Sequence, residues 1–372
     1  MPAGNIPYLS VAEATQLQFK LVDCIHRHFP NAAFLRTGDL GLAENGRPTQ
    51  TAAVEATLAS FFGAEDCALV RGAGTGAIRL GLESLVKAGD TVLVHAAPIY
   101  PSTQASLDSL GVELNRVDFN RPELFRWELA ERRPKLALIQ HARQLLRDDY
   151  DIAELIAEAK RQGCPVLVDD NYAVLKDPVD GIAAGADISA FSMFKLLGPP
   201  GIGCVLGRKD LMDSIRAKLC TGGTQVQGFE AMDALRSLVA APVLMAIQAA
   251  EIDKIYAEIK KLICRPERYL IKDVFVASMQ SRVLMVEFTE PIAPRVMEHA
   301  AALGASPYPV GAESRYEAPA LFYKASRTFL ADEPRAMDYF LRINPMRSGC
   351  ETVMRILTEA IEAIRREGYG CS

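Results

Sequence analysis

The sequence predicts an α/β protein: a three-layer, mainly parallel, seven-stranded sheet covered by helices, followed by a smaller α+β C-terminal domain. Three observations lead to this prediction. Short runs of β type alternate with helical stretches between residues 67 and 207. Most of these runs are continuously apolar, as strands buried on both faces are. The chain has 372 residues, more than one hydrophobic core usually holds, so more than one domain is expected.

The main domain is predicted from alternating strands and helices. Its strands are CALVR (67–71), TVLVH (91–95), VELNRVD (112–118), LALIQ (136–140), PVLVD (165–169), DISAF (187–191) and GCVLG (203–207). Helices are predicted at 11–29, 51–63, 77–87, 102–110 and 151–161, and a long helical region runs from 209 to about 263.

The pattern changes after Arg265. A strand is predicted at 281–290, a helix at 294–304, a short strand at 341–344 and an amphipathic helix at 351–366. We therefore predict a large domain over 51–264, a small domain over 265–372, and an N-terminal segment, 1–50, that packs with the small domain.

Composition argues against several kinds of partner. The net charge is −5 and there is no basic stretch, so a nucleic-acid backbone is a poor ligand. No run of 18 apolar residues predicts a membrane span, and the N-terminus has no signal-peptide pattern. The eight cysteines are scattered without metal-ligand spacing, which favours free thiols and predicts no metal site. We expect a cytoplasmic protein.

A glycine-rich turn follows the first predicted strand. Residues 72–77 read Gly-Ala-Gly-Thr-Gly-Ala and open a helix. Bare backbone N–H groups at the positive end of a helix dipole bind anions, typically phosphate, and the Thr75 hydroxyl adds a donor. The spacing matches neither a P-loop nor GxGxxG. The alternative is a tight strand-to-helix turn without a ligand.

Two further residues lie where strands end, which is where open parallel sheets bind ligands. Asp169 ends an apolar strand and either points into the ligand crevice or caps the next segment. Lys195 lies in an apolar neighbourhood before a Gly/Pro loop. Burial lowers the pKa of a lysine and makes its amine nucleophilic, which suits a Schiff base. The alternative for Lys195 is an ordinary surface lysine.

The sequence combines a phosphate turn, an acidic residue at a strand end and a Ser-x-x-Lys motif, in this order, with alternating strands and helices. This combination resembles the fold type I pyridoxal-phosphate (PLP) enzymes, which form the aspartate aminotransferase superfamily. The resemblance extends from about Phe34 to the C-terminus. It implies the PLP-transferase fold, PLP as cofactor, and a homodimer with the site at the interface. It also implies an amino-acid substrate.

The resemblance implies roles for particular residues. Lys195 resembles the lysine that binds PLP as a Schiff base, and Ser192 the phosphate-binding serine. Asp169 resembles the aspartate that pairs with the pyridine nitrogen, and Tyr100 the aromatic residue that stacks on the ring. Gly74, Thr75 and Gly76 resemble the phosphate turn of the family.

Further roles follow from position alone. His141 or Arg143, after the LALIQ strand, is similar to a residue that touches the phenolic oxygen of PLP. Arg342 falls where family members hold the substrate carboxylate, which an arginine fork suits; the alternative is a surface arginine. Thr224 lies in a loop similar to one that reaches the phosphate across a dimer interface. Arg47 is a further candidate for the phosphate.

The chain also departs from the family pattern. Gly203 stands where many aminotransferases have a phosphate-binding arginine, and Leu196 and Leu197 replace the threonine of the sulfur amino-acid branch. Lys195 follows Asp169 by 26 residues, a spacing closer to that branch. The stretches QHAR and FKLLGPPGIG are similar to the YhfS-like and aluminium-resistance families.

The function implied by the resemblance is a PLP-dependent aminotransferase. The alternatives are a carbon–sulfur β- or γ-lyase or replacement enzyme, favoured by the Asp169–Lys195 spacing, and a non-catalytic protein that retains the fold. The sequence does not identify the amino acid.

Overall fold

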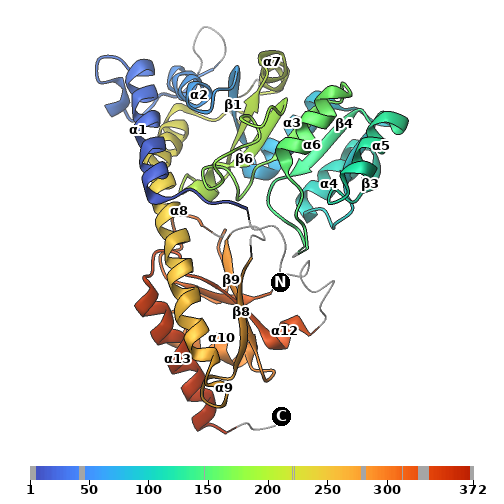
Figure 1. The fold of residues 1–372 in the computed structure, drawn as a ribbon. Helices are drawn as coiled ribbons and strands as arrows, with labels where there is room; N and C mark the ends of the chain where they lie inside the picture. Colours follow the sequence, from blue (N-terminus) through green and yellow to red (C-terminus); the bar gives the residue numbers. More distant parts are fainter. Residues whose placement is uncertain are drawn as a thin grey trace. The chain divides into compact units, whose positions relative to one another are not determined.

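The computed structural model describes residues 6–41, 47–145, 147–219, 221, 223–277, 282–311, 313–325 and 335–368. The chain forms two compact units (Figure 1). The larger comprises residues 12–142 and 149–243, and the smaller residues 1–11, 143–148 and 244–372. The limits predicted above for the folding domains stay a prediction.

The larger unit contains the predicted seven-stranded sheet, in the order β1-β7-β6-β5-β4-β2-β3. β7 runs antiparallel to both β1 and β6, and the other neighbours are parallel. The predicted fold class is therefore confirmed. The strands are β1 (Asp66–Arg71), β2 (Thr91–His95), β3 (Glu113–Val117), β4 (Leu136–Gln140), β5 (Val166–Asp169), β6 (Ile188–Ser192) and β7 (Ile202–Gly207).

Helices cover both faces of this sheet. Successive strand residues point to opposite faces. Val92 and Val94 therefore pack with α3 (Ala73–Leu85), α4 (Pro101–Leu110) and α7 (Lys209–Ala217). Leu93 packs on the other side with α5 (Pro122–Arg132) and α6 (Ile152–Arg161). The strand interiors are apolar because both faces are buried.

The remaining helices of this unit are α1 (Val11–His28), α2 (Thr49–Phe62), the 3₁₀ turns η1 (Ala33–Leu35) and η2 (Met193–Leu196), and the first part of α8 (Gly228–Ile263). Among the described helices, α8 is long and apolar enough to cross a membrane by length and composition. Half of its most apolar window is buried in the protein, as in the core helix of a globular domain.

The smaller unit contains a four-stranded antiparallel sheet, in the order β10-β11-β9-β8. Its strands are β8 (Ile271–Ala277), β9 (Val283–Phe288), β10 (Leu321–Lys324) and β11 (Phe340–Asn344). One face packs against α10 (Ala293–Ala302), α13 (Cys350–Arg366) and the last turns of α8. Two short helices, α9 (Pro266–Tyr269) and α12 (Ala336–Tyr339), complete the unit.

The structure corrects some predicted elements. The region predicted as one helix over 209–263 is two helices: between α7 and α8, the Thr221 carbonyl accepts from the N–H groups of Thr224 and Gln225, which is a turn rather than a continued helix. The helix α5 was missed because only Phe125 and Leu129 form its buried stripe. The strands β8 and β10 were missed because β8 is partly exposed and β10 has four residues.

Six of the cysteines are free thiols: Cys24, Cys67, Cys164, Cys204, Cys264 and Cys350. Cys220 and Cys371 lie outside the described residues.

Candidate active site

The carboxyl ends of β1, β4, β5 and β6 meet at one edge of the sheet, because β1 and β6 are both antiparallel to β7 and so run in the same direction. Asp169 and Ser192 are the last residues of β5 and β6, and Gly72 follows β1. The predicted phosphate turn, carboxylate and lysine therefore lie at the edge where such sheets bind ligands.

The turn after β1 uses its glycines for close packing. A Cβ on Gly76 would lie 1.9 Å from the Arg71 carbonyl oxygen, and one on Gly74 would lie 2.4 Å from Asn171 Oδ1. Gly72 has φ of 94°, in the left-handed region that favours glycine. The N–H groups of Gly74 and Thr75 lie in the first turn of α3, where no intrahelical acceptor exists. The turn therefore presents donors at the positive end of a helix.

The hydroxyl groups beside this turn add to the donor set. Thr75 Oγ1 donates a hydrogen bond to Ser102 Oγ at 3.0 Å. Ser192 is buried at the start of η2. These neutral donors suit an anion that brings its own charge.

Asp169 is held by its neighbour Asn171. Both the backbone N–H and the side-chain amide of Asn171 donate to Asp169 Oδ1, at 3.0 and 2.8 Å. The amide oxygen of Asn171 accepts from the Ser192 N–H at 3.0 Å. Burial raises the pKa of Asp169, and the bonds from Asn171 and the charge of Lys195 oppose that rise. Asn171 thus orients the carboxylate and couples β5 to β6.

Lys195 is half-buried on η2 and lies near two aromatic rings. Its Nζ is 3.5 Å from the centroid of the Tyr172 ring and 6.0 Å from that of Tyr100. Tyr172 has φ of 70°, which is rare and costly for an aromatic residue. Backbone strain of this kind occurs at functional sites, where the surrounding structure maintains it.

Gly203 has no room for a side chain. A Cβ there would lie 2.2 Å from the Ala73 carbonyl oxygen and 3.1 Å from Ala77 Cβ. The loop before it also packs on the phosphate turn, because the Gly201 carbonyl accepts from the N–H groups of Gly72 and Ala73 at 2.8 and 3.0 Å. The close packing of β7 against α3 explains why no arginine stands at position 203.

His141 is buried between two carboxylates. Its Nδ1 is 2.7 Å from Asp170 Oδ1 and its Nε2 is 3.2 Å from Asp177 Oδ2. Burial alone would lower the pKa of His141, but the bonds to Asp170 and Asp177 outweigh it and raise that pKa to about 9. Both ring nitrogens thus have carboxylate partners.

The structure gives the following partners and positions for the other predicted residues. Thr224 Oγ1 donates to the Thr221 carbonyl at 3.0 Å within an exposed turn. Arg143 and Arg342 belong to the smaller unit. On β11, Arg342 Nε donates to the Lys324 carbonyl at 2.7 Å, and its guanidinium lies 4.1 Å from the centroid of the Tyr323 ring.

The sequence analysis missed the roles of Asn171 and Tyr172. Their only sequence signal is the polar Asp-Asp-Asn-Tyr directly after an apolar strand. The bonds of Asn171 and the contact of Tyr172 with Lys195 depend on how neighbouring strands end, which the order of residues does not reveal.

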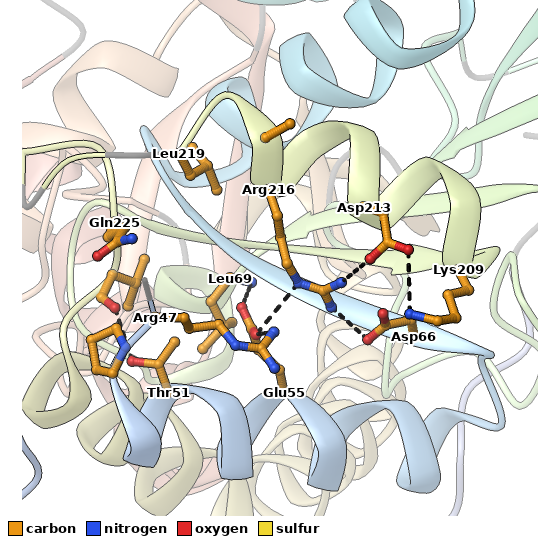
Figure 2. A pocket seen from close by; sticks show the side chains of 13 residues that line it. Arg47, Thr51, Glu55, Asp66, Leu69, Lys209, Asp213, Arg216, Leu219 and Gln225 are labelled. Atoms are coloured by element: carbon orange, nitrogen blue, oxygen red, sulfur yellow. Dashed lines mark hydrogen bonds and ion pairs between the residues drawn. The ribbon is translucent and has the colours of Figure 1, made fainter. Parts of the chain in front are cut away.

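A cavity of about 520 Å³ lies elsewhere, along β1, and of the candidate residues named above only Arg47 lines it (Figure 2). Arg47 and Arg216 converge on the buried carboxylate of Glu55. Arg47, a candidate for the phosphate, thus forms an ion pair at 2.5 Å with Glu55. Leu69 N–H donates to Glu55 at 2.8 Å, and Arg216 donates to the Cys67 carbonyl at 2.8 Å. These charged side chains satisfy backbone groups on the open edge of the sheet.

A helix N-terminus with anion donors, a buried carboxylate and a lysine thus lie at the ends of parallel strands, an arrangement that suits an aminotransferase-like α/β protein. The chain belongs to the class-V aminotransferase family, whose family model matches residues 43–240. Residues 257–357 match the C-terminal domain of YhfS-like proteins. The resemblance inferred from the sequence is therefore confirmed.

The chain is 48% identical over 357 residues to the uncharacterised protein YhfS of Escherichia coli strain K12, covering 96% of this chain and 98% of that protein. The crystal structure of the YhfS protein from Escherichia coli, described as pyridoxal-5'-phosphate dependent, matches with a TM-score of 0.95 and 47% identity. That match covers 98% of this chain and all of the other.

More distant relatives cover less of the chain or share only its fold. A cysteine desulfurase of Klebsiella pneumoniae (strain 342) is 35% identical over 164 residues, 41% of this chain and 40% of that protein. A cystathionine gamma lyase, CalE6, from Micromonospora echinospora matches with a TM-score of 0.71 and 18% identity, over 93% of this chain and 99% of the other. The second match concerns the fold alone.

Proposed function

We propose that this protein is a PLP-dependent enzyme that acts on an amino acid, with Lys195 as the residue that binds the cofactor covalently, and that its reaction is an amino transfer. The position of Lys195 carries the proposal. Its amine lies against the rings of Tyr172 and Tyr100, at the sheet edge that also holds Asp169. Family membership and the PLP dependence of the YhfS relative support it.

The residues present fit PLP. The cofactor carries a phosphate dianion, an aromatic ring with a basic nitrogen, and an aldehyde. The N–H groups of Gly74 and Thr75, with the hydroxyls of Thr75 and Ser192, suit the phosphate, while Gly76 shapes the turn by donating its N–H to the Gly72 carbonyl at 2.8 Å. The carboxylate of Asp169 suits a protonated ring nitrogen, and the rings of Tyr100 and Tyr172 suit an aromatic face. Without an arginine at position 203, the phosphate depends on neutral donors and the helix dipole.

Each residue has a chemical task in this proposal. PLP supplies an electron sink for a carbanion at the substrate Cα. Asp169 keeps the ring nitrogen protonated through its charge. Lys195 accepts and returns the Cα proton as a general base. Arg342 is our candidate for the substrate carboxylate, and Arg143 and Thr224 are our candidates for contacts with the cofactor.

The test is covalent trapping. Purified protein should absorb visible light, and borohydride should bleach this absorbance and leave a reduced adduct on Lys195 in a peptide digest. Lys195→Ala should form no adduct yet still bind added PLP. A colourless wild-type protein that takes up no PLP would refute the proposal. An adduct on another lysine would refute the assignment to Lys195.

Elimination at a carbon–sulfur bond is the second candidate function. The 26-residue spacing from Asp169 to Lys195 and the similarity to a cysteine desulfurase favour it. Single amino acids separate the two reactions. A lyase releases a 2-oxo acid and ammonia with many turnovers. An aminotransferase stops after one equivalent of 2-oxo acid, without ammonia, until a second 2-oxo acid is added. PLP binding without either product would indicate a non-catalytic protein.

We also propose that the enzyme is a cytoplasmic homodimer. Three exposed apolar side chains, Leu35, Leu40 and Phe229, lie on segments that contact one another; we call them the 35–40/229 surface. The Gly228 N–H donates to the Asp39 carbonyl at 2.9 Å, which attaches one segment to the other. An exposed apolar patch of this kind favours a protein contact.

A further inference from the structure

His141, although predicted to contact the cofactor, is placed to act on the loop that carries the predicted cofactor residues. It follows β4, and Asp170 follows the neighbouring parallel strand β5. The His141 N–H donates to the Asp169 carbonyl at 3.0 Å, which extends the strand pairing by one residue. The backbone of His141 therefore fixes the residue that bears the catalytic carboxylate.

The imidazole ring reaches further into the same loop. Its two nitrogens contact Asp170 Oδ1 at 2.7 Å and Asp177 Oδ2 at 3.2 Å. An ionised carboxylate can only accept hydrogen bonds, so both ring nitrogens must donate and the ring carries a positive charge. His141 and Asp170 are almost fully buried. This buried cation thus joins the end of β4 to both ends of the 170–177 segment.

Asp170 is itself fully engaged. Its second oxygen accepts from the Gly181 N–H at 2.8 Å and from the Ser189 hydroxyl. A Cβ on Gly181 would lie 2.8 Å from Asp170 Oδ2, so the close approach requires glycine. Asp177 Oδ1 accepts from the Val179 N–H at 2.9 Å. The carboxylates are therefore anchors of the loop, and His141 is their shared counter-ion.

The loop needs such anchors because it is strained. Tyr172 and Leu175 have φ of 70° and 61°, which costs free energy for residues with large side chains. Lys176 Nζ donates to the Tyr172 carbonyl at 3.0 Å and helps to hold this conformation. The strained backbone places the Tyr172 ring against Lys195 and Asn171 against Asp169. If the anchors were lost, the loop would relax and both contacts would be lost.

The charges of the groups around His141 also indicate that its ring stabilises this loop. Asp170 acts on its neighbour Asp169 to raise the pKa of that carboxyl. The titratable groups that face the His141 ring are Asp170 and Asp177; Asp180 interacts with both Asp170 and His141. Without the imidazolium, buried carboxylates would be left uncompensated, which is strongly unfavourable. The positive ring offsets their charge close to Asp169.

We propose that His141 is a positioning residue, a buried imidazolium that fixes the loop from Asp169 to Asp177 and thereby orients Asp169 and Tyr172, and that it neither contacts the cofactor nor exchanges a proton during turnover. The inference rests on the proposed function, because its purpose is to present a cofactor site. It differs from the role that the resemblance implied for His141.

The first test measures cofactor binding in three proteins. His141→Gln should weaken PLP binding by about tenfold or more, because Asp170 and Asp177 lose their counter-ion. The double variant His141→Gln/Asp170→Asn should recover part of the affinity, since it removes the more deeply buried of the two uncompensated charges. Asp177→Asn, which removes one anchor but leaves His141 paired with Asp170, should weaken PLP binding by less than His141→Gln does. Affinity is read from absorbance during titration of the apoenzymes with PLP.

The second test observes the ring in the intact holoenzyme. With ¹⁵N-labelled histidine, the His141 signals are assigned by their shift in Asp177→Asn. Both ring nitrogens should stay protonated from about pH 6 to about pH 8. This measurement holds even if His141→Gln fails to fold.

Several results would overturn the inference. One is wild-type PLP affinity in His141→Gln with a lower kcat, which would mean that His141 takes part in the chemistry. Another is a double variant no better than His141→Gln, and a third is a neutral His141 ring near pH 7. A wild-type protein that binds no PLP would instead refute the proposed function.

Discussion

Asp169 has to remain an anion although it is buried. Burial favours the neutral acid, and the carboxylate depends on two hydrogen bonds from Asn171 and on the charge of Lys195 to offset this. A positive charge on a bound ring nitrogen would add a third favourable interaction. The strength of cofactor binding should therefore depend on the charge of this one side chain.

Asp169→Asn tests that dependence. The amide keeps the size of the side chain and can still accept from Asn171, but it has no charge. We expect the Kd for PLP to rise by about tenfold or more, measured by absorbance titration, and turnover to fall below detection. Glu154→Gln is the control, because Glu154 is an exposed carboxylate on α6 that is not among the proposed site residues. Wild-type Kd and turnover in Asp169→Asn would remove Asp169 from the mechanism.

Gly203 is a residue whose smallness matters for packing. Gly203→Ala should lower the free energy of unfolding by about 1–3 kcal/mol, because its methyl group would collide with the Ala73 carbonyl in a packed interface. Urea unfolding gives the number. Gly223→Ala is the matched control, since the nearest atom to its Cβ would be 3.9 Å away. Equal stability of the two variants would show that β7 and α3 can separate at little cost.

At the scale of elements, β1 is an edge strand of the sheet, and charged side chains form hydrogen bonds with its backbone groups. An unpaired edge strand exposes N–H and C=O groups that invite pairing with another chain. The carboxylate of Glu55, from α2, accepts from the Leu69 N–H (Figure 2). Arg216, from α7, donates to the Cys67 carbonyl. Arg216 also pairs with Asp66 at 2.6 Å. Two helices thus protect one strand through ionic side chains.

Because Glu55 is one of the groups that protect this edge, the free energy of unfolding should depend on pH. Burial, opposed by Arg47, the Leu69 N–H and Arg216, raises the pKa of Glu55 from 4.5 to about 7. The folded state therefore binds this proton more tightly than the unfolded state, and the stabilisation is lost as pH rises toward 7. The stability of wild type relative to Glu55→Gln should fall by about 2 kcal/mol between about pH 5 and about pH 8.

Urea unfolding at a series of pH values measures this difference. Glu131→Gln, at an exposed position, is the control and should track wild type at every pH. A constant difference between wild type and Glu55→Gln over this range would mean that Glu55 is ionised throughout and that its ion pair with Arg47 outweighs burial.

At the scale of the whole molecule, the 35–40/229 surface is a group of apolar side chains that a single chain leaves uncovered. Its three apolar side chains are 80%, 76% and 52% exposed at Leu35, Leu40 and Phe229. Apolar area of this kind is normally covered by a partner, and a second copy of this chain is the partner that we propose.

Leu40→Asp/Phe229→Asp should shift the protein from dimer to monomer in sedimentation velocity, because each dimer would bury four unpaired carboxylates. Trp127→Ser provides the control: Trp127 is 50% exposed on α5, outside that surface, and its loss should leave the dimer intact. A double variant that sediments as wild type would place the subunit contact elsewhere.

Prediction from sequence was most accurate for elements that are determined by residues close together in the chain. The strands at 91–95 and 136–140 were predicted to the residue, because each is a short apolar run bounded by polar residues. The helix α5 was missed because two buried residues leave almost no periodic signal. The turn between α7 and α8 was missed because the residues on both sides continue a helical pattern.

The sequence alone determined the α/β fold class, the succession of strands along the chain and the residue types at their ends, because hydrophobic runs and glycine turns act over a few neighbours. Tertiary structure alone decided how those ends combine. It placed His141 between Asp170 and Asp177, and it placed the Tyr172 ring next to Lys195. It also left no space for a side chain at position 203. These contacts join residues from different strands, so only the packing of the sheet brings them within bonding distance.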